Sequence, residues 1–306
     1  MYFPTANIEI NPFVPPAVAF IVSFFTSMGG VSGAFLLLPF QVSILGFTSP
    51  SVSATNQLFN IVGIPSGIYC YIKQGRMVWP LAMSIVLGAI PGVIIGALIR
   101  IEYFPDPHTF KMFVGIVLLY IGSRLLKDVL KKVPESQKDT VQDRGAGCGL
   151  SPVLSRVSVS EFSVTRIGFD FQGRSHSVNT LGLVLLSALV GMLGGVYGIG
   201  GGAIIAPFMV SFMGLPVYIV AGAALMGTFV TSIAGVVFYQ SIASFYPDLA
   251  VSPDWMLGVM FGVGGLGGMY CGAMAQRFVP EKLIKWLLVG CILFVSLGYI
   301  ISFFQH

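Results

Sequence analysis

Two glycine-rich stretches, each followed by a proline, are the parts of this sequence best suited to hold a ligand. They are residues 29–33 with Pro39 and residues 198–202 with Pro207. Glycine lets the backbone approach a ligand closely, and a helix that restarts after such a break presents unpaired N–H groups. Each helix start also carries about half a positive charge, so two facing starts would bind an anion without lysine or arginine. The alternative is that the glycines only permit close helix crossings.

Hydroxyl and amide side chains lie in the apolar segments that follow these breaks. Asparagine and glutamine are unfavourable at membrane depth unless they have partners, which favours ligand contact. The predicted substrate-binding residues are Gly29, Gly30, Ser32, Gly33, Thr55, Asn56, Gln57, Gly198, Gly200, Gly201, Gly202, Thr228 and Ser232. The alternative is hydrogen bonding between helices, which is worth about 0.6–2 kcal/mol for each pair.

The composition places these residues in a membrane protein. Hydrophobic residues make up 55% of the 306-residue chain, charged residues make up 9%, and the mean hydropathy is +0.88. Soluble domains carry about 25% charged residues. No Asp, Glu, Lys or Arg occurs within residues 10–72 or 175–247, and such long neutral stretches are typical of membrane spans. The composition therefore excludes a soluble enzyme, a nucleic-acid-binding protein and a disordered scaffold, and it makes the lipid bilayer the expected environment.

Apolar segments occupy most of the chain, and each is expected to be helical because lipid offers the backbone no hydrogen-bond partners. The expected segments are 14–30, 33–46, 51–72, 78–99, 109–126, 181–196, 201–214, 217–244, 255–276 and 282–303. Two of them are short and are interrupted by Pro39 and Pro207. These two short segments contain the restarting helices on which the predicted anion site depends.

The second half of the chain repeats features of the first half. Each half has one segment in which glycine recurs at every fourth residue, which is typical of close helix contact. These glycines are Gly88, Gly92 and Gly96 in the first half and Gly264, Gly268 and Gly272 in the second half. Lysine and arginine concentrate in the loops around 73–76, 127–174 and 277–285, which should therefore be cytoplasmic. Alternation then places both termini outside and inverts one half relative to the other, as in many secondary transporters.

We predict an all-α polytopic membrane protein with two inverted repeats of about five helical segments each, which gives 8–10 spans. The first repeat is residues 1–126 and the second is residues 180–306. The cytosolic linker between them, residues 127–179, is expected to contain a β-hairpin over residues 157–171, where Val, Ile, Phe and Thr roughly alternate with other residues. A multi-pass location in the cell inner membrane is expected, and the oligomeric state stays open.

The sequence offers little for catalysis or cofactor binding. No carboxylate, lysine, arginine or histidine falls in the middle of an expected span, so neither an intramembrane enzyme nor a buried proton relay is expected. The four cysteines have no metal-ligand spacing. Two matches to a dinucleotide-binding motif, beginning at Gly198 and Gly262, lack the strand and the acidic residue of that fold. We therefore expect no metal and no cofactor.

The elements 29–39 and 198–207 resemble those of the TauE/SafE sulfite exporter family, also called the 4-toluene sulfonate uptake permease family. Ala54-Thr55-Asn56 and Met226-Gly227-Thr228, at the starts of later segments, are further matches. The first element departs from the family pattern, with Val31-Ser32 where a glycine run is usual. The resemblance covers nearly the whole chain outside the linker. It implies transport of small sulfur-containing anions, such as sulfite, sulfonates or sulfoacetate.

Together these features predict a membrane transporter, and specifically an exporter, of a small sulfur-containing anion that works by alternating access. The alternatives are an anion channel, a carrier for another small organic acid, or a sensory or assembly protein that acts through its linker. Without titratable groups deep in the spans, transport would be driven by the substrate gradient and the membrane potential, or by protons carried on the substrate. A negative-inside potential favours the exit of an anion by about 2.3 kcal/mol per charge per 100 mV.

Overall fold

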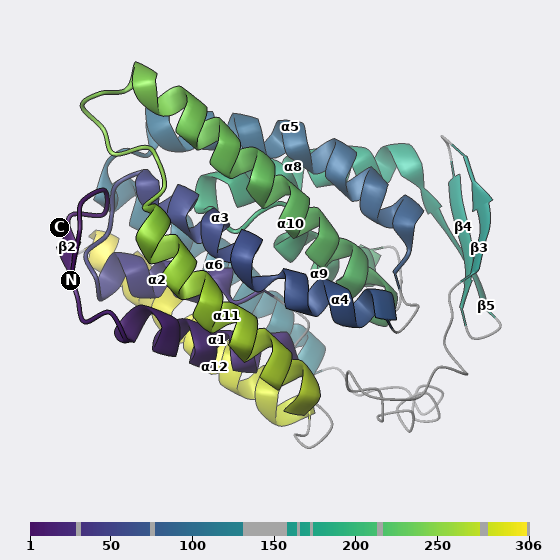
Figure 1. Cartoon of the computed structure of the whole chain (residues 1–306). Helices are drawn as coiled ribbons and strands as arrows, with labels where there is room; N and C mark the ends of the chain where they lie inside the picture. Colours follow the sequence, from purple (N-terminus) through teal and green to yellow (C-terminus); the bar gives the residue numbers. More distant parts are fainter. Residues whose placement is uncertain are drawn as a thin grey trace.

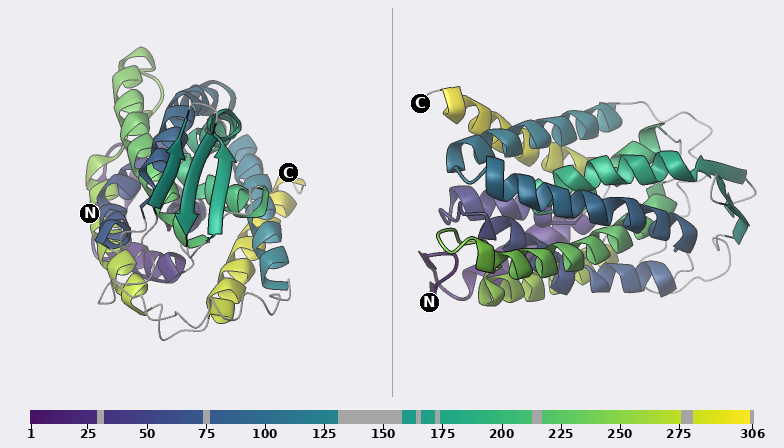
Figure 2. Two further views of the ribbon diagram at one scale, coloured as in Figure 1. Left: turned by 90° about the vertical axis from the view of Figure 1, so that its right-hand side faces the viewer. Right: turned by 90° about the horizontal axis from the view of Figure 1, so that it is seen from above.

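The structure is a computed structural model that describes residues 1–28, 32–73, 77–130, 158–163, 166–171, 174–212, 217–275 and 281–304. The helices form one bundle (Figure 1). A small β-sheet lies beyond one end of this bundle, and both chain termini lie at the other end (Figure 2). We call these the sheet end and the terminal end.

The helices occur where the apolar segments predict them. The first half contains α1 (Val14–Met28), α2 (Ala34–Ser43), α3 (Ser51–Gly63), α4 (Pro65–Lys73), α5 (Trp79–Tyr103) and α6 (Pro107–Leu130). The second half contains α8 (Thr180–Tyr197), α9 (Gly202–Phe212), α10 (Val217–Ile242), α11 (Trp255–Ala275) and α12 (Glu281–Phe304). A single 3₁₀ turn, η2 (Ala243–Phe245), follows α10.

One expected segment, 51–72, forms two helices instead of one. α3 ends at Gly63 and α4 begins at Pro65, because proline has no N–H with which to continue the helical hydrogen bonds. The Ile64 amide still donates to the Asn60 carbonyl at 3.0 Å, and the Gly67 amide donates to the Ile64 carbonyl at 2.9 Å. The break is therefore a local interruption and not a loop.

The surface of the bundle is that of a membrane protein. In the described part of the chain, four helices are long and apolar enough to cross a bilayer. They are α5, α8, α10 with the turn that follows it, and α11. Large apolar side chains point outward from them, including Leu87, Leu185 and Val263, whose exposed fractions are 66%, 59% and 60%. Large apolar surfaces of this kind are unfavourable in water but not in lipid. The predicted helical polytopic membrane fold is confirmed.

The two glycine stripes form matching contacts between opposite halves of the chain. Glycines of α5 lie against main-chain carbonyls of α8, and glycines of α11 lie against those of α1. The glycine–carbonyl pairs are Gly88–Val184, Gly92–Ala188, Gly96–Met192, Gly264–Pro16, Gly268–Phe20 and Gly272–Phe24. A Cβ atom at any of these glycines would overlap the carbonyl oxygen, as expected from the four-residue spacing. Figure 1 shows α1 running from the terminal end toward the sheet end and α8 running the opposite way, as inverted halves require.

The linker contains one strand more than the sequence predicts. β3 (Ser158–Phe162), β4 (Arg166–Phe171) and β5 (Arg174–Asn179) form an antiparallel sheet in that order. The predicted hairpin covers β3 and β4 but omits β5, which has a single β-branched residue, Val178, and so lacks a strand pattern. β5 leads directly into α8, where Asn179 Oδ1 accepts a hydrogen bond from the Gly182 amide at 3.0 Å. α6 extends past the expected boundary at residue 126, and linker residues 131–157 lie outside the described residues.

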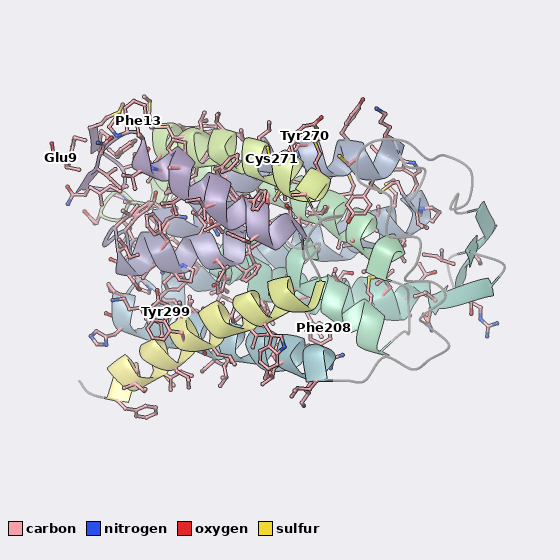
Figure 3. The ribbon with its side chains drawn as sticks, turned by 90° about the horizontal axis from the view of Figure 1, so that it is seen from below. Glu9, Phe13, Phe208, Tyr270, Cys271 and Tyr299 are labelled. Carbon is pink, nitrogen blue, oxygen red and sulfur yellow. The ribbon has the colours of Figure 1, made fainter. Side chains whose placement is uncertain are left out.

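Two tyrosines of the second half hold the short helix α2 of the first half. Tyr197 Oη at the end of α8 donates to the Phe35 carbonyl at 2.7 Å. Tyr299 Oη, labelled on α12 in Figure 3, donates to the Pro39 carbonyl at 3.2 Å. At the terminal end, the strands β1 (Tyr2–Phe3) and β2 (Ile8–Glu9) form a small hairpin.

Candidate functional site

The second glycine break separates α8 from α9 and turns the chain sharply. Gly198 and Gly200 have φ angles of +81° and +75°, in the left-handed region that favours glycine. Gly198 ends α8, and its amide donates to the Gly194 carbonyl at 2.8 Å. α9 then begins at Gly202, and the first amides of a helix have no partner within it.

Neighbouring helices pack closely against this break. A Cβ atom at Gly198 would lie 2.5 Å from the Ser53 Cα atom of α3, and one at Gly202 would overlap the Ala224 carbonyl of α10. The break therefore lies between α3 and α10, the two helices that carry most of the predicted polar residues.

Asn56 on α3 connects the second break with the first. Its Nδ2 atom donates to the Gly198 carbonyl and to the Ala34 carbonyl, each at 3.0 Å. Gln41 Nε2 donates to Asn56 Oδ1 at 3.3 Å, which fixes the orientation of the amide. One fully buried side chain thus ties the start of α2 to the end of α8.

Asn60 lies one turn further along α3 and makes a similar set of contacts. Its Nδ2 atom donates to the Ile199 carbonyl at 3.0 Å and to Ser232 Oγ at 3.4 Å. Ser32 Oγ donates to Asn60 Oδ1 at 2.7 Å. Asn60 is not among the predicted site residues, but its spacing of four from Asn56 places it on the same helix face.

On α10, the hydroxyl that contacts the break amides belongs to Thr231. Its Oγ1 atom accepts a hydrogen bond from the Gly201 amide at 3.1 Å and donates to the Gly227 carbonyl at 2.7 Å. The predicted residue Thr228 lies beside Gly202, but its hydroxyl donates to a carbonyl of its own helix, that of residue 224, at 2.9 Å. Thr231 is not among the predicted site residues either. Its position three residues after Thr228 places it on the same helix face, and this spacing could have identified it.

The first break is described only in part, because Gly29 and Gly30 lie outside the described residues. Gly33 precedes α2 and faces two hydroxyls of α1. A Cβ atom there would lie 3.0 Å from Ser23 Oγ and 3.3 Å from Thr26 Oγ1. Ser23 Oγ is buried and has no hydrogen-bond partner among the residues that the structure describes, so a polar group lies beside this break as well.

Two of the three predicted polar residues of α3, Thr55 and Gln57, do not contact the second break. Thr55 Oγ1 accepts a hydrogen bond from the Asp254 amide at 2.9 Å, just before the start of α11. Gln57 is fully buried against Gly235 of α10, and neither of its amide atoms has a hydrogen-bond partner. The position of Thr55 indicates a role in holding α11.

The residues that the structure does bring together form one group between α3 and α10, which we call the break cluster. It consists of Ser32, Asn56, Asn60, Gly198, Ile199, Gly200, Gly201, Gly202, Thr228, Thr231 and Ser232. Its polar side chains are neutral amides and hydroxyls. Two amides donate to break carbonyls, and the positive end of the α9 dipole lies beside them. Such an arrangement favours a negatively charged ligand.

Arg100 is a buried charge that lies just beyond the expected segment 78–99. α5 runs to Tyr103 and carries Arg100 into the bundle, where its side chain is fully buried. Nη1 donates to the Phe104 carbonyl, Nη2 donates to the Thr48 carbonyl at 2.9 Å, and the guanidinium carbon lies 3.7 Å from the centre of the Phe110 ring. The spacing from the glycine stripe could have indicated this burial. Arg100 follows Gly96, the last glycine of the α5 stripe, by four residues and so lies on the same buried face of the helix.

The family model described as sulfite exporter TauE/SafE matches residues 16–299. The chain belongs to the TauE/SafE sulfite exporter family. The matched range includes the break cluster, α3, α10 and Arg100, so the features described above lie within the TauE/SafE region.

This TauE/SafE chain is also similar to the probable membrane transporter protein YunE of Bacillus subtilis (strain 168). The two are 28% identical over 110 residues, which is 36% of this chain and 40% of YunE. The chain therefore aligns with less than half the length of that relative. No solved structure matches the chain significantly.

Proposed function

We propose that this protein exports a small sulfur-containing anion, such as sulfite or an organosulfonate, which binds at the break cluster. The observation that carries the proposal is that Asn56 and Asn60 donate to the carbonyls of Gly198 and Ile199. These donors compensate the negative ends of peptide dipoles that would otherwise repel an anion. The amides at the start of α9 then remain available to the oxygens of sulfite or a sulfonate.

The substrate class follows from combining this chemistry with family membership. The break cluster selects for charge and for hydrogen-bond acceptors, and it does not by itself select sulfur. Membership of a sulfite exporter family supports a sulfur oxyanion over other small anions. The similarity to a probable membrane transporter supports transport over a sensory role.

Alternating access is the proposed mode of transport. The two halves form reciprocal glycine contacts, α5 with α8 and α11 with α1, and Asn56 links the breaks of both halves. Rocking of one half against the other would open the break cluster to each side of the membrane in turn. The C-terminal ends of α4 and α6, which carry Lys73 and Lys127, and the strand β4, which begins at Arg166, lie toward the sheet end. This favours a cytoplasmic sheet and external termini in the cell inner membrane. The membrane potential would then drive anion exit.

A thermal-shift panel on the purified protein tests the proposal. Sulfite, thiosulfate, sulfoacetate and taurine are compared with sulfate and with carboxylates at equal ionic strength. A ligand at 100 times its Kd stabilises the folded state by about 2.7 kcal/mol, so a true substrate should raise Tm clearly. No rise with any sulfur-containing anion would contradict the proposal. Counterflow of labelled sulfite in liposomes distinguishes a carrier from a channel, because only a carrier shows saturable exchange.

A further inference from the structure

The guanidinium of Arg100 has one N–H group that no described residue accepts. Its two terminal nitrogens donate to the carbonyls of Phe104 and Thr48, whereas the buried Nε atom has no hydrogen-bond partner. Arginine binds oxyanions through such N–H edges, with hydrogen bonds that charge makes strong. This N–H group is therefore a donor suited to an oxyanion.

The positive charge of Arg100 also lacks a counter-charge within the described part of the chain. Three carboxylates near the terminal end, those of Glu102, Asp106 and Asp254, have other partners. Tyr246 Oη donates to Glu102, the Thr109 hydroxyl donates to Asp106 at 2.6 Å, and the Leu257 amide donates to Asp254 at 3.0 Å. Buried cations are normally paired, because removing a charge from water is unfavourable. An anion that binds beside Arg100 and is then released would supply the missing negative charge.

A row of polar residues connects Arg100 with the break cluster. Asn60, Gln57 and Ser53 lie at successive turns on one face of α3, in the direction of its start. Gln57 is buried with both amide atoms unpartnered. Ser53 Oγ donates to the Val196 carbonyl at 3.1 Å. Its neighbour Ala54 packs in one buried cluster with Tyr239 of α10 and with Ala97 and Ile101 of α5, the helix that carries Arg100. An anion that moves along this face would meet the buried amide of Gln57 between the two positions.

We propose that Arg100 forms a second anion site at the terminal end of the bundle, separate from the break cluster. A small oxyanion released from the break cluster passes Gln57 and pairs with the Nε–H group of Arg100 before it leaves the protein. The inference rests on the proposed function, because the ligand is the same transported anion.

Sulfite titrations of the full-length protein in detergent test this site. Arg100→Gln should weaken sulfite binding at least tenfold, and Arg100→Lys, which keeps the charge but loses the planar donor edge, should weaken it several-fold. Lys111→Gln is the matched control, because it removes the same charge from a half-buried position near the start of α6. It should change affinity less than twofold. Equal affinity of the wild type and both Arg100 variants would overturn the second site.

A spectroscopic measurement keeps the test independent of how well the variants fold. In protein labelled with ¹⁵N-arginine, sulfite should shift the Nε–H resonance of Arg100, which is identified by its absence from the Arg100→Lys spectrum. Saturating sulfite that shifts other signals but leaves this resonance unmoved would refute the Arg100 site and leave the proposed function standing. Failure of the wild-type protein to bind sulfite or sulfoacetate at all would refute both.

Discussion

Asn56 Nδ2 donates to the Gly198 carbonyl oxygen at 3.0 Å, across the boundary between the two halves of the chain. The same nitrogen donates to the Ala34 carbonyl at the start of α2, also at 3.0 Å. A motion that separates the two glycine breaks must stretch at least one of these bonds. In the proposed transport cycle, Asn56 therefore couples the state of the break cluster to the relative position of the halves.

Replacing Asn60 with aspartate should weaken sulfite binding at the break cluster. Aspartate has the same shape, but it removes the donor to the Ile199 carbonyl and places a negative charge beside the bound anion. We expect affinity to fall at least tenfold, which corresponds to about 1.4 kcal/mol. Titration calorimetry with sulfite at low ionic strength measures the change.

Asn179→Asp is the matched control for this substitution. Asn179 caps α8 through its Oδ1 atom, a role that aspartate fills equally well, and it lies outside the break cluster. Its sulfite affinity should equal that of the wild type. If Asn60→Asp also bound sulfite normally, the anion would have to bind elsewhere.

Alanine at Gly92 should destabilise the bundle. Its Cβ atom would overlap the Ala188 carbonyl, so α5 and α8 would have to move apart. We expect the free energy of unfolding to fall by about 1–3 kcal/mol. Gly268→Ala, which meets the Phe20 carbonyl, should have a similar effect because the contacts are reciprocal. Thermal unfolding in a single detergent compares the variants.

Gly290→Ala on α12 provides the contrast, because no described atom beyond the adjacent part of its own helix lies within 4 Å of the position that its Cβ would take. It should be neutral, or it should raise stability by up to about 1 kcal/mol, because alanine is the better helix former. Equal Tm values for Gly92→Ala and Gly290→Ala would show that the glycine stripe is not tightly packed.

The helices and the close helix pairs could be predicted because local rules determine them. Lipid requires helical backbone wherever a long apolar segment occurs, and a four-residue spacing keeps Gly88, Gly92 and Gly96 on one face. The elements that the sequence did not reveal depend on other forces. β5 pairs with β4 although it lacks a strand pattern of its own, so its conformation comes from its neighbour.

Side-chain roles in the site were harder to predict, because they depend on contacts between residues far apart in the sequence. Thr55 meets the Asp254 amide and Asn60 meets Ser232, and neither pairing follows from a local pattern. Arg100 falls outside the expected segment 78–99 because helix ends predicted from sequence are uncertain by several residues, whereas α5 continues past it to Tyr103. Asn56 was predicted to contact the ligand because it lies near the start of the segment that follows the first break. The structure shows that it bonds to Ala34 and Gly198, and its contact with a ligand stays a prediction.

Thr55→Val should lower stability but leave sulfite affinity unchanged. Valine has the shape of threonine but cannot accept the hydrogen bond of the Asp254 amide, which would be left buried and unpaired. Such a loss is worth about 1–3 kcal/mol. Thr231→Val should weaken sulfite binding as well, because Thr231 contacts the Gly201 amide within the break cluster. Thermal unfolding and calorimetry on the same samples separate the two effects. A Thr55→Val protein with normal Tm and weakened binding would place Thr55 in the substrate site.

Gln57→Met should stabilise the protein and slow transport. The buried amide of Gln57 has no hydrogen-bond partner, and an apolar side chain of similar length removes a penalty of about 1–3 kcal/mol. The same change removes the unpaired polar group between the break cluster and Arg100, so sulfite flux in liposomes should fall. Gln240→Met, at an exposed position of α10 where the side chain accepts a bond from Trp255, is the control and should leave flux unchanged. An evolved protein retains an unfavourable buried amide only where function requires it. A Gln57→Met variant that is more stable and transports sulfite at the wild-type rate would therefore remove Gln57 from the anion path.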